Sequence, residues 1–210
     1  MKNLGLLIGS LVITLVAVVA IAVLFTRKVN APIVPADPQV LVGNSVNTKG
    51  NPEAKVTVVE FSDFQCPSCK AIQPLIEEVY SSASDSVKIV YRHFPLRTIH
   101  PNALAAAKAS QAAGRQNKFF DYHDKLFAAQ EEWAEESDPM GKFEQYASEL
   151  GLNVDQWKKD VADKAIEDIV LKDEVDGNTL GVDSTPTIYV NNVKTDLNDV
   201  SSAVAQALAQ

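Results

Sequence analysis

The chain has 210 residues, with 27 acidic side chains, 19 Lys or Arg side chains and a formal net charge of −8. This length allows one folded core with appended segments. The acidic balance and the lack of a basic cluster argue against a nucleic acid as partner. The only two cysteines stand in a single C-x-x-C pair.

The chain starts with a long apolar stretch. Residues 4–25 include no charged side chain, and as a helix they would span about 33 Å, enough to cross the core of a bilayer. The apolar region of a cleaved signal peptide is shorter, ~7–15 residues. We therefore predict an uncleaved transmembrane signal-anchor over residues 1–28, with cleavage at Ala20-Ile21-Ala22 as the alternative. Basic residues flank both ends, so the positive-inside rule does not give the orientation.

Residues 29–50 are predicted to link this anchor to a folded domain. They contain Pro32, Pro35 and Pro38, which favour an extended, semi-rigid stalk. A first edge strand is predicted near Val40 to Val46.

The two cysteines lie where a predicted strand passes into a predicted helix. Val56–Phe61 is β-branched and apolar on both faces, as in a buried central strand, and Cys69–Tyr80 has apolar residues at helical spacing. Pro67 suits the first helical position, which leaves Cys66 at the N-cap. There the unpaired amides and the helix dipole stabilise a thiolate, the reactive form of cysteine. We predict that Cys66 is the exposed attacking thiol and Cys69 the resolving one.

Two other interpretations of the C-x-x-C pair are open. It could be half of a zinc site, but zinc binds four ligands, and His93, His100 and His123 have no matching paired spacing. It could be a purely structural disulfide, but across so short a loop such a bond stabilises little on loop-entropy grounds. A redox-active pair is therefore favoured.

Glu60 shares a strand face with Val56 and Val58. The pattern leaves two alternatives: a carboxylate buried beneath the dithiol, or an acid at an exposed strand end. A buried carboxylate has its neutral form favoured by desolvation. It could then exchange a proton with Cys69 as that thiol leaves or returns.

The region after the dithiol continues the alternation of helix and strand. Pro74 is predicted to kink its helix rather than end it, because the apolar periodicity continues beyond it. Residues 87–94 are predicted to form a strand parallel to the first, and residues 95–180 to be helical. One helix is predicted to end at Gly114 as its C′ residue, and another to be interrupted near Asp163. The chain is predicted to end with two hairpin strands and a helix: Thr187–Val190, Val193–Thr195 and Asn198–Leu208.

Several motifs occur in an order that resembles one family. The first group is an acid six positions before the first cysteine, the pair itself, and two residues after it: Glu60, Cys66-Pro67-Ser68-Cys69, Lys70 and Pro74. The later motifs are Tyr91–Leu96, His100–Ala103, Tyr122–Phe127 and Gly181–Asn191. Together they resemble the thioredoxin superfamily, and more closely its DsbA-like branch (DsbA/BdbD-type) of extracytoplasmic thiol–disulfide oxidoreductases.

The resemblance implies an α/β thioredoxin fold over residues 51–210, preceded by the N-terminal transmembrane helix. A DsbA-like helical insertion is expected at about residues 97–180. The resemblance also implies that the Thr185–Pro186 bond is cis and that Thr185 lies beside the Cys66 sulfur.

The same resemblance favours the buried, catalytic alternative for Glu60. The implied site residues are two catalytic cysteines, this acid and four supporting residues: Cys66, Cys69, Glu60, Pro67, Ser68, Thr185 and Pro186. The redox group is the Cys66–Cys69 disulfide itself, and no metal or other cofactor is expected.

The function implied is a dithiol oxidase that introduces disulfides into exported proteins, with its catalytic domain outside the cytoplasm on a single-pass anchor. Its partners would be thiol-containing clients, the membrane, and a quinone-linked membrane reoxidase resembling DsbB or the vitamin K epoxide reductase family. Two alternatives are open. One is a membrane-tethered reductase or isomerase, and the other is a non-enzymatic thioredoxin-fold binding module that uses the groove beside Pro186.

Overall fold

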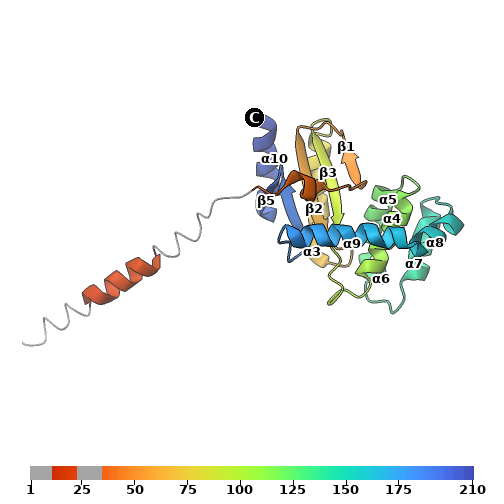
Figure 1. Cartoon of the computed structure of the whole chain (residues 1–210), viewed down its shortest axis with the longest axis horizontal. Helices are drawn as coiled ribbons and strands as arrows, with labels where there is room; N and C mark the ends of the chain where they lie inside the picture. Colours follow the sequence, from red (N-terminus) through yellow and green to blue (C-terminus); the bar gives the residue numbers. More distant parts are fainter. Residues whose placement is uncertain (1–10, 23–34) are drawn as a thin grey trace, which may run out of the picture. The chain divides into compact units, whose positions relative to one another are not determined.

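The computed structural model describes residues 11–22 and 35–210, which fall in two units, Met1–Val34 and Pro35–Gln210 (Figure 1). Residues 11–22 form a helix whose large apolar side chains are exposed. No helix among the described residues is long and apolar enough to cross a membrane. The rest of the predicted anchor 1–28, and residues 29–34 of the predicted linker, lie outside the described residues.

A five-stranded sheet with the order β1-β3-β2-β4-β5 lies at the centre of the second unit. The central pair, β2 (Val56–Ser62) and β3 (Val87–His93), is parallel, as predicted, with Val56 opposite Val87 and Ser62 opposite His93. The other pairings are antiparallel and involve β1 (Thr48–Gly50), β4 (Thr187–Val190) and β5 (Val193–Thr195).

One face of the sheet is covered by α3 (Pro67–Ser82) and α10 (Val200–Ala209), the latter preceded by a short 3₁₀ turn at Leu197–Asp199. Pro74 lies inside α3, as predicted. The apolar core under these helices consists of strand and helix side chains: Val56, Val58, Ile76, Val79, Val87, Ile89, Ile188, Val190, Val200 and Val204. Residues of β2 at even positions therefore point toward α3, because side chains of a strand alternate between its faces.

The segment between β3 and β4 is helical, as predicted. Its helices are α4 (Ala103–Gly114), α5 (Phe119–Ala128), α6 (Gln130–Trp133), α7 (Met140–Glu149), α8 (Val154–Ala162) and α9 (Lys164–Thr179). Figure 1 shows α4 to α8 gathered beyond one end of the sheet, while α9 returns across the strands. Asp163 separates α8 from α9, and its side chain accepts a hydrogen bond from the Ala165 amide, which starts the second helix.

The predicted edge strand at Val40 to Val46 is wrong. Residues Pro38–Val42 form a short helix, α2, because Asp37 accepts a hydrogen bond from the Gln39 amide and Pro38 occupies the first helical turn. The edge strand is β1, which begins later, at Thr48. A cap signal at Asp37-Pro38 therefore outweighs the β-branched composition that follows it.

The predicted end of α4 at Gly114 is also wrong. The helix includes Gly114, and Arg115 is its C-cap residue. The left-handed conformation is adopted by Asn117, at φ 60°, a residue type that tolerates it.

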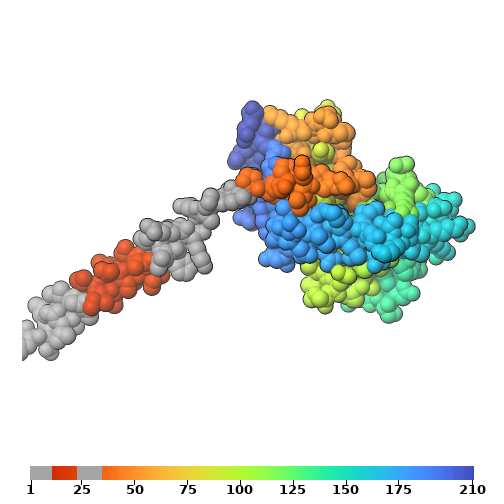
Figure 2. All heavy atoms as spheres, viewed as in Figure 1, coloured from red at the N-terminus to blue at the C-terminus, as the bar shows by residue number. Residues whose placement is uncertain are grey.

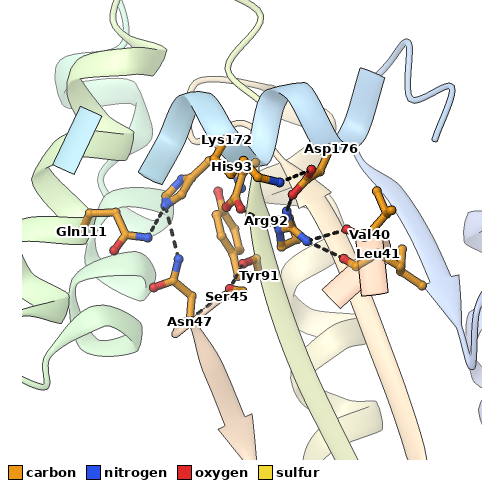
Figure 3. A network of polar contacts seen from close by, with 11 residues as sticks. Val40, Leu41, Ser45, Asn47, Tyr91, Arg92, His93, Gln111, Lys172 and Asp176 are labelled. Carbon is orange, nitrogen blue, oxygen red and sulfur yellow. Dashed lines mark hydrogen bonds and ion pairs between the residues drawn. The ribbon is translucent and has the colours of Figure 1, made fainter. Parts of the chain in front are cut away.

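Arg92 on β3 is fully buried and joins three parts of the fold (Figure 3). Its Nε donates to Asp173 Oδ1 at 2.7 Å and its Nη2 to Asp176 Oδ2 at 2.6 Å. Its Nη1 donates to the carbonyls of Val40 at 3.0 Å and Leu41 at 2.6 Å. This guanidinium therefore ties α2 and α9 to the central sheet.

The two helices that Arg92 joins, α2 and α9, also pack against each other at the surface. Figure 2 shows the side chains of α9 forming a band across this face next to the segment that contains α2, and the two helices are in contact. A Cβ on Gly43 would lie only 2.8 Å from Arg92 Nη1, at a backbone φ of +55°.

Burial raises the pKa of Asp173 to about 6, against the opposing effect of Arg92.

Replacing Arg92 with Met is expected to lower the free energy of unfolding by about 3–5 kcal/mol, because it leaves Asp173 buried without its charge partner and Asp176 paired only with Lys172. Arg97→Met is the matched control, since Arg97 pairs with Glu174 on the surface and is 48% exposed. That change should cost no more than about 1 kcal/mol. Urea unfolding of both variants checks the difference, and equal losses would contradict the assigned role of Arg92.

Candidate active site

Cys66 is the N-cap residue of α3 and Pro67 occupies the first helical turn, as predicted. Both cysteines are present as thiols, and Cys69 is fully buried. The prediction that Cys66 is exposed is wrong, because only 7% of its surface is accessible. The cause is the loop before β4, which lies against the sulfur: the Cys66 sulfur is 3.5 Å from the Thr185 carbonyl oxygen.

The pKa of Cys66 is lowered from that of an ordinary thiol to about 5. The largest cause is a hydrogen bond from the Cys69 thiol, which outweighs the opposing effect of burial. Thr185 and the amides of Cys69 and Ser68 lower it further. The helix start therefore contributes to the thiolate, as predicted, but the neighbouring thiol contributes more.

The pKa of Cys69 moves in the opposite direction. Burial raises it most, followed by the hydrogen bond that it donates to Cys66 and by the nearby charge of Glu60. Its sulfur accepts a hydrogen bond from the Asp63 amide at 3.5 Å. At neutral pH the pair therefore consists of a Cys66 thiolate and a Cys69 thiol.

Glu60 is 1% exposed at the end of β2, which settles the sequence alternatives in favour of burial. Its Oε1 accepts from the Ser62 hydroxyl at 2.7 Å and from Gln73 Nε2 at 3.1 Å. Burial raises the pKa of this carboxyl. A cavity of about 350 Å³ reaches Glu60 and is also lined by Gln73, Tyr91 and His123.

The Thr185–Pro186 peptide bond is cis, as the resemblance implied, and places Thr185 beside Cys66. The Thr185 hydroxyl is buried, and it has no hydrogen-bond partner among the residues that the structure describes. Ser68 follows Pro67 in the first turn of α3, where it lines an open groove between α3 and the chain end.

Sequence reasoning missed the amide side chains that hold the active-site loop. Gln130 Nε2 donates to the carbonyls of Phe64 at 2.7 Å and Cys66 at 3.0 Å. Gln65 Nε2 donates to the Ala134 carbonyl at 2.7 Å, and Gln65 Oε1 accepts from the Asn102 amide at 2.7 Å. Buried polar side chains of this kind are hydrogen-bonded. The only sign of these contacts in the sequence is the polar residue Gln65 directly before Cys66.

Asp63 is a second buried acid that sequence reasoning did not single out. Its carboxylate accepts from the amides of Gln65 at 2.7 Å and Leu96 at 2.8 Å, and contacts His100 Nδ1 at 2.7 Å. Asp63 thus fixes the turn between β2 and α3. His100 is its hydrogen-bonding partner.

The other two histidines are also buried near the site. Burial lowers the pKa of His93 to about 3, so this ring is neutral at physiological pH. His123 packs against Phe64 and Tyr91 with ring centroids 5.6 Å and 5.1 Å apart. Within residues 11–22 and 35–210, no group of three or more His, Cys, Asp or Glu side chains is placed to hold a metal ion.

A parallel β2–α3–β3 unit with a dithiol at the helix start and a cis-proline loop facing it defines a thioredoxin-like protein. Residues 44–209 match the family model described as Thioredoxin. The chain belongs to the thioredoxin family.

Similar solved structures narrow the class. BdbD from Bacillus subtilis is 25% identical, with a TM-score of 0.72 over 86% of this chain and 100% of that one. A thioredoxin-like oxidoreductase from Silicibacter pomeroyi DSS-3 is 26% identical, with a TM-score of 0.68 over 83% and 99%. The thiol-disulfide exchange protein alpha-DsbA2 from Wolbachia pipientis is 25% identical, with a TM-score of 0.68 over 80% and 90%. The chain is similar to thiol–disulfide oxidoreductases of DsbA type, and the predicted resemblance is confirmed.

Curated relatives with higher identity carry a different name. The Na⁺/H⁺ antiporter NhaA 1 of Salinispora arenicola (strain CNS-205) is 36% identical over 181 residues, which is 84% of this chain and 26% of that protein. An antiporter of the same name from Mycobacterium sp. (strain KMS) is 35% identical over 161 residues, 75% of this chain and 24% of that protein. The chain spans about a quarter of the length of these relatives.

The stability of the reduced protein should depend on pH through Cys66. Between about pH 5 and the ordinary thiol pKa near 8.5, the unfolded chain binds a proton at Cys66 that the folded chain does not, so stability rises with pH. This contribution is lost as pH falls through about 5. We expect the melting temperature of the reduced form to fall relative to the oxidised form on acidification.

Thermal unfolding of both redox forms across this pH range measures the effect. Cys66→Ala is the control, because it removes the titrating sulfur and should abolish the Cys66 contribution to the pH dependence. If the difference in melting temperature between the reduced and oxidised forms does not change between pH 7 and pH 4, the Cys66 pKa is not depressed.

Proposed function

We propose that the chain is a dithiol oxidase that introduces disulfides into exported proteins through its Cys66–Cys69 pair. The observation that carries this proposal is the opposite displacement of the two thiol pKa values, down to about 5 at Cys66 and upward at Cys69. A stabilised Cys66 thiolate is a good leaving group and favours the reduced state of the enzyme, which makes the disulfide oxidising.

The reaction has two exchange steps. A client thiolate attacks Cys66, the bond to Cys69 breaks, and Cys69 leaves with the electron pair and takes up a proton. The second client thiol then attacks the client sulfur of the mixed disulfide, and Cys66 leaves as a thiolate. The client is oxidised and the pair Cys66–Cys69 is reduced. Glu60, buried next to Cys69, is the proposed proton source.

The surroundings of Cys66 suit an extended client segment. Thr185 presents its backbone beside the sulfur on the cis Pro186 loop, where a client strand could be added. A mainly apolar groove of about 490 Å³ begins at Ser68 and continues between Ile72 of α3 and Leu197. Pro67 and Ser68 complete the first turn that orients Cys66.

We place this oxidase outside the cytoplasm, on a single-pass membrane anchor within residues 1–28. The uncharged run 4–25 and the exposed apolar side chains of the helix 11–22 support an anchor. The relatives named as antiporters are membrane transport proteins, which supports a site of action at a membrane. Reoxidation is assigned to a quinone-linked membrane partner of the DsbB-like or vitamin K epoxide reductase-like kind, which would return the pair to its disulfide.

The equilibrium potential of the Cys66–Cys69 couple against glutathione tests the direction of the reaction. We expect a value well above that of thioredoxin, about −270 mV, together with oxidation of a reduced client protein. Cys69→Ser should trap mixed disulfides with clients, whereas Cys66→Ser should trap none. A potential at or below that of thioredoxin would favour the reductase alternative, and full activity of Cys66→Ser in cells would favour the binding module.

Fusion of alkaline phosphatase to the C-terminus of the full chain tests the location, because this reporter is active only outside the cytoplasm. We expect activity in the membrane fraction, and loss of activity when residues 4–25 are deleted. A matched cytoplasmic reporter should show the reverse pattern. High activity of the cytoplasmic reporter on the intact chain would overturn the proposed topology.

A further inference from the structure

Ser62 is a buried hydroxyl next to the dithiol that the exchange steps described above do not use. It is the last residue of β2 and is 1% exposed. It lies two positions after Glu60, so both side chains point to the same face of the sheet, the face covered by α3. The Ser62 hydroxyl donates a hydrogen bond to Glu60 Oε1 at 2.7 Å.

The other neighbour of Ser62 is Cys69. The amide of Asp63, the residue that follows Ser62, donates to the Cys69 sulfur at 3.5 Å. Ser62 also lowers the pKa of the Cys69 thiol, against the larger effect of burial. The serine hydroxyl is thus bonded to the carboxyl, and the amide of the next residue is bonded to the leaving sulfur.

Gln73 and Tyr91, two other polar groups near Glu60, are less suited to pass a proton. Gln73 Nε2 contacts both Glu60 and the Cys69 carbonyl, at 3.1 Å and 3.0 Å, but an amide nitrogen only donates. The Tyr91 hydroxyl is buried without a hydrogen-bond partner in the described part of the chain. A serine hydroxyl both donates and accepts, so it can give one proton while it receives another.

We propose that the Ser62 hydroxyl carries the proton between Glu60 and Cys69. The proposal rests on the dithiol exchange described under the proposed function. When a thiolate attacks Cys66, the Cys66–Cys69 bond breaks and its electron pair stays on Cys69. Ser62 turns its O–H from Glu60 to Cys69, Cys69 takes this proton, and Ser62 takes the proton of the Glu60 carboxyl. The products are a Cys69 thiol, an intact Ser62 hydroxyl and a Glu60 carboxylate.

The cavity beside Glu60 supplies the other end of this path. Its volume of about 350 Å³ exceeds the roughly 30 Å³ share of one water molecule, and both Glu60 and Lys70 line it. Glu60 can therefore recover its proton from solvent without passing it back through Ser62. In the reverse reaction the proton travels from Cys69 through Ser62 to Glu60.

The test is the single-turnover rate at which glutathione reduces the oxidised full-length chain, since this step requires Cys69 to leave. We expect Ser62→Ala to slow it by about 100-fold, at the low end of general acid catalysis. Ser62→Thr keeps the hydroxyl and should restore most of the rate. Ser110→Ala is the matched control. It removes a buried serine that bonds only the Ala107 carbonyl, at 2.8 Å, and should leave the rate unchanged.

A double-mutant cycle separates a relay from a structural role. If Ser62 acts through Glu60, the Ser62→Ala/Glu60→Gln variant should be no slower than Glu60→Gln alone. The relay would be overturned if the fold-losses of the two single variants multiply in the double variant, or if Ser62→Ala reacts as fast as the original chain.

A measurement on the unaltered chain covers the case in which Ser62→Ala does not fold. Two protons move together in the relay, so the rate in mixtures of light and heavy water should curve with deuterium fraction. A linear dependence would indicate a single proton and contradict the proposal. If the oxidised chain does not react with glutathione at all, the proposed function fails instead, so the two failures are distinguishable.

Discussion

The chemistry of this protein depends on the hydrogen bond between its two sulfur atoms. The Cys69 thiol donates to Cys66, and this contact is the largest cause of the low pKa of Cys66. The same contact helps to keep the proton on Cys69, so one interaction assigns opposite roles to two residues of the same type. The helix start and Thr185 increase the difference.

Burial contributes to the difference between the two cysteine pKa values, and it also means that Cys69 needs a proton when it leaves. Cys69 and Glu60 are both almost fully buried, where a charge on either is unfavourable. A sulfur that leaves with a negative charge in such a place needs a proton, and Glu60 is a nearby acid whose pKa burial has raised. The low solvent access of the site and the presence of a buried acid are thus two parts of one arrangement.

Much of the fold and part of the site follow from local sequence. The apolar run Val56–Phe61, Pro67 after Cys66 and the position of Pro74 predict the strand, the N-cap and the continuing helix, because each depends on neighbouring residues. The errors arose where a distant segment decides the outcome. Cys66 is covered by the loop at Thr185, and no local pattern indicates that contact.

The same limit explains the residues that sequence reasoning missed. Gln130 reaches the Cys66 carbonyl from 64 positions away, and Asp173 reaches Arg92 from 81 positions away. Charge and polarity in the sequence do not state which partner a side chain meets. The cis Thr185–Pro186 bond came from the family resemblance, since an X–Pro bond in a folded protein is cis only about 5–6% of the time.

The narrow access to Cys66 has a consequence for timing. A sulfur that is 7% exposed beneath the Thr185 loop can be reached by a cysteine on a thin, pliable stretch of polypeptide, but not by one on a broad rigid surface. Such stretches are abundant on a nascent chain and scarce once it has compacted. The proposed oxidase would therefore act on a substrate early in its maturation, before that substrate has compacted.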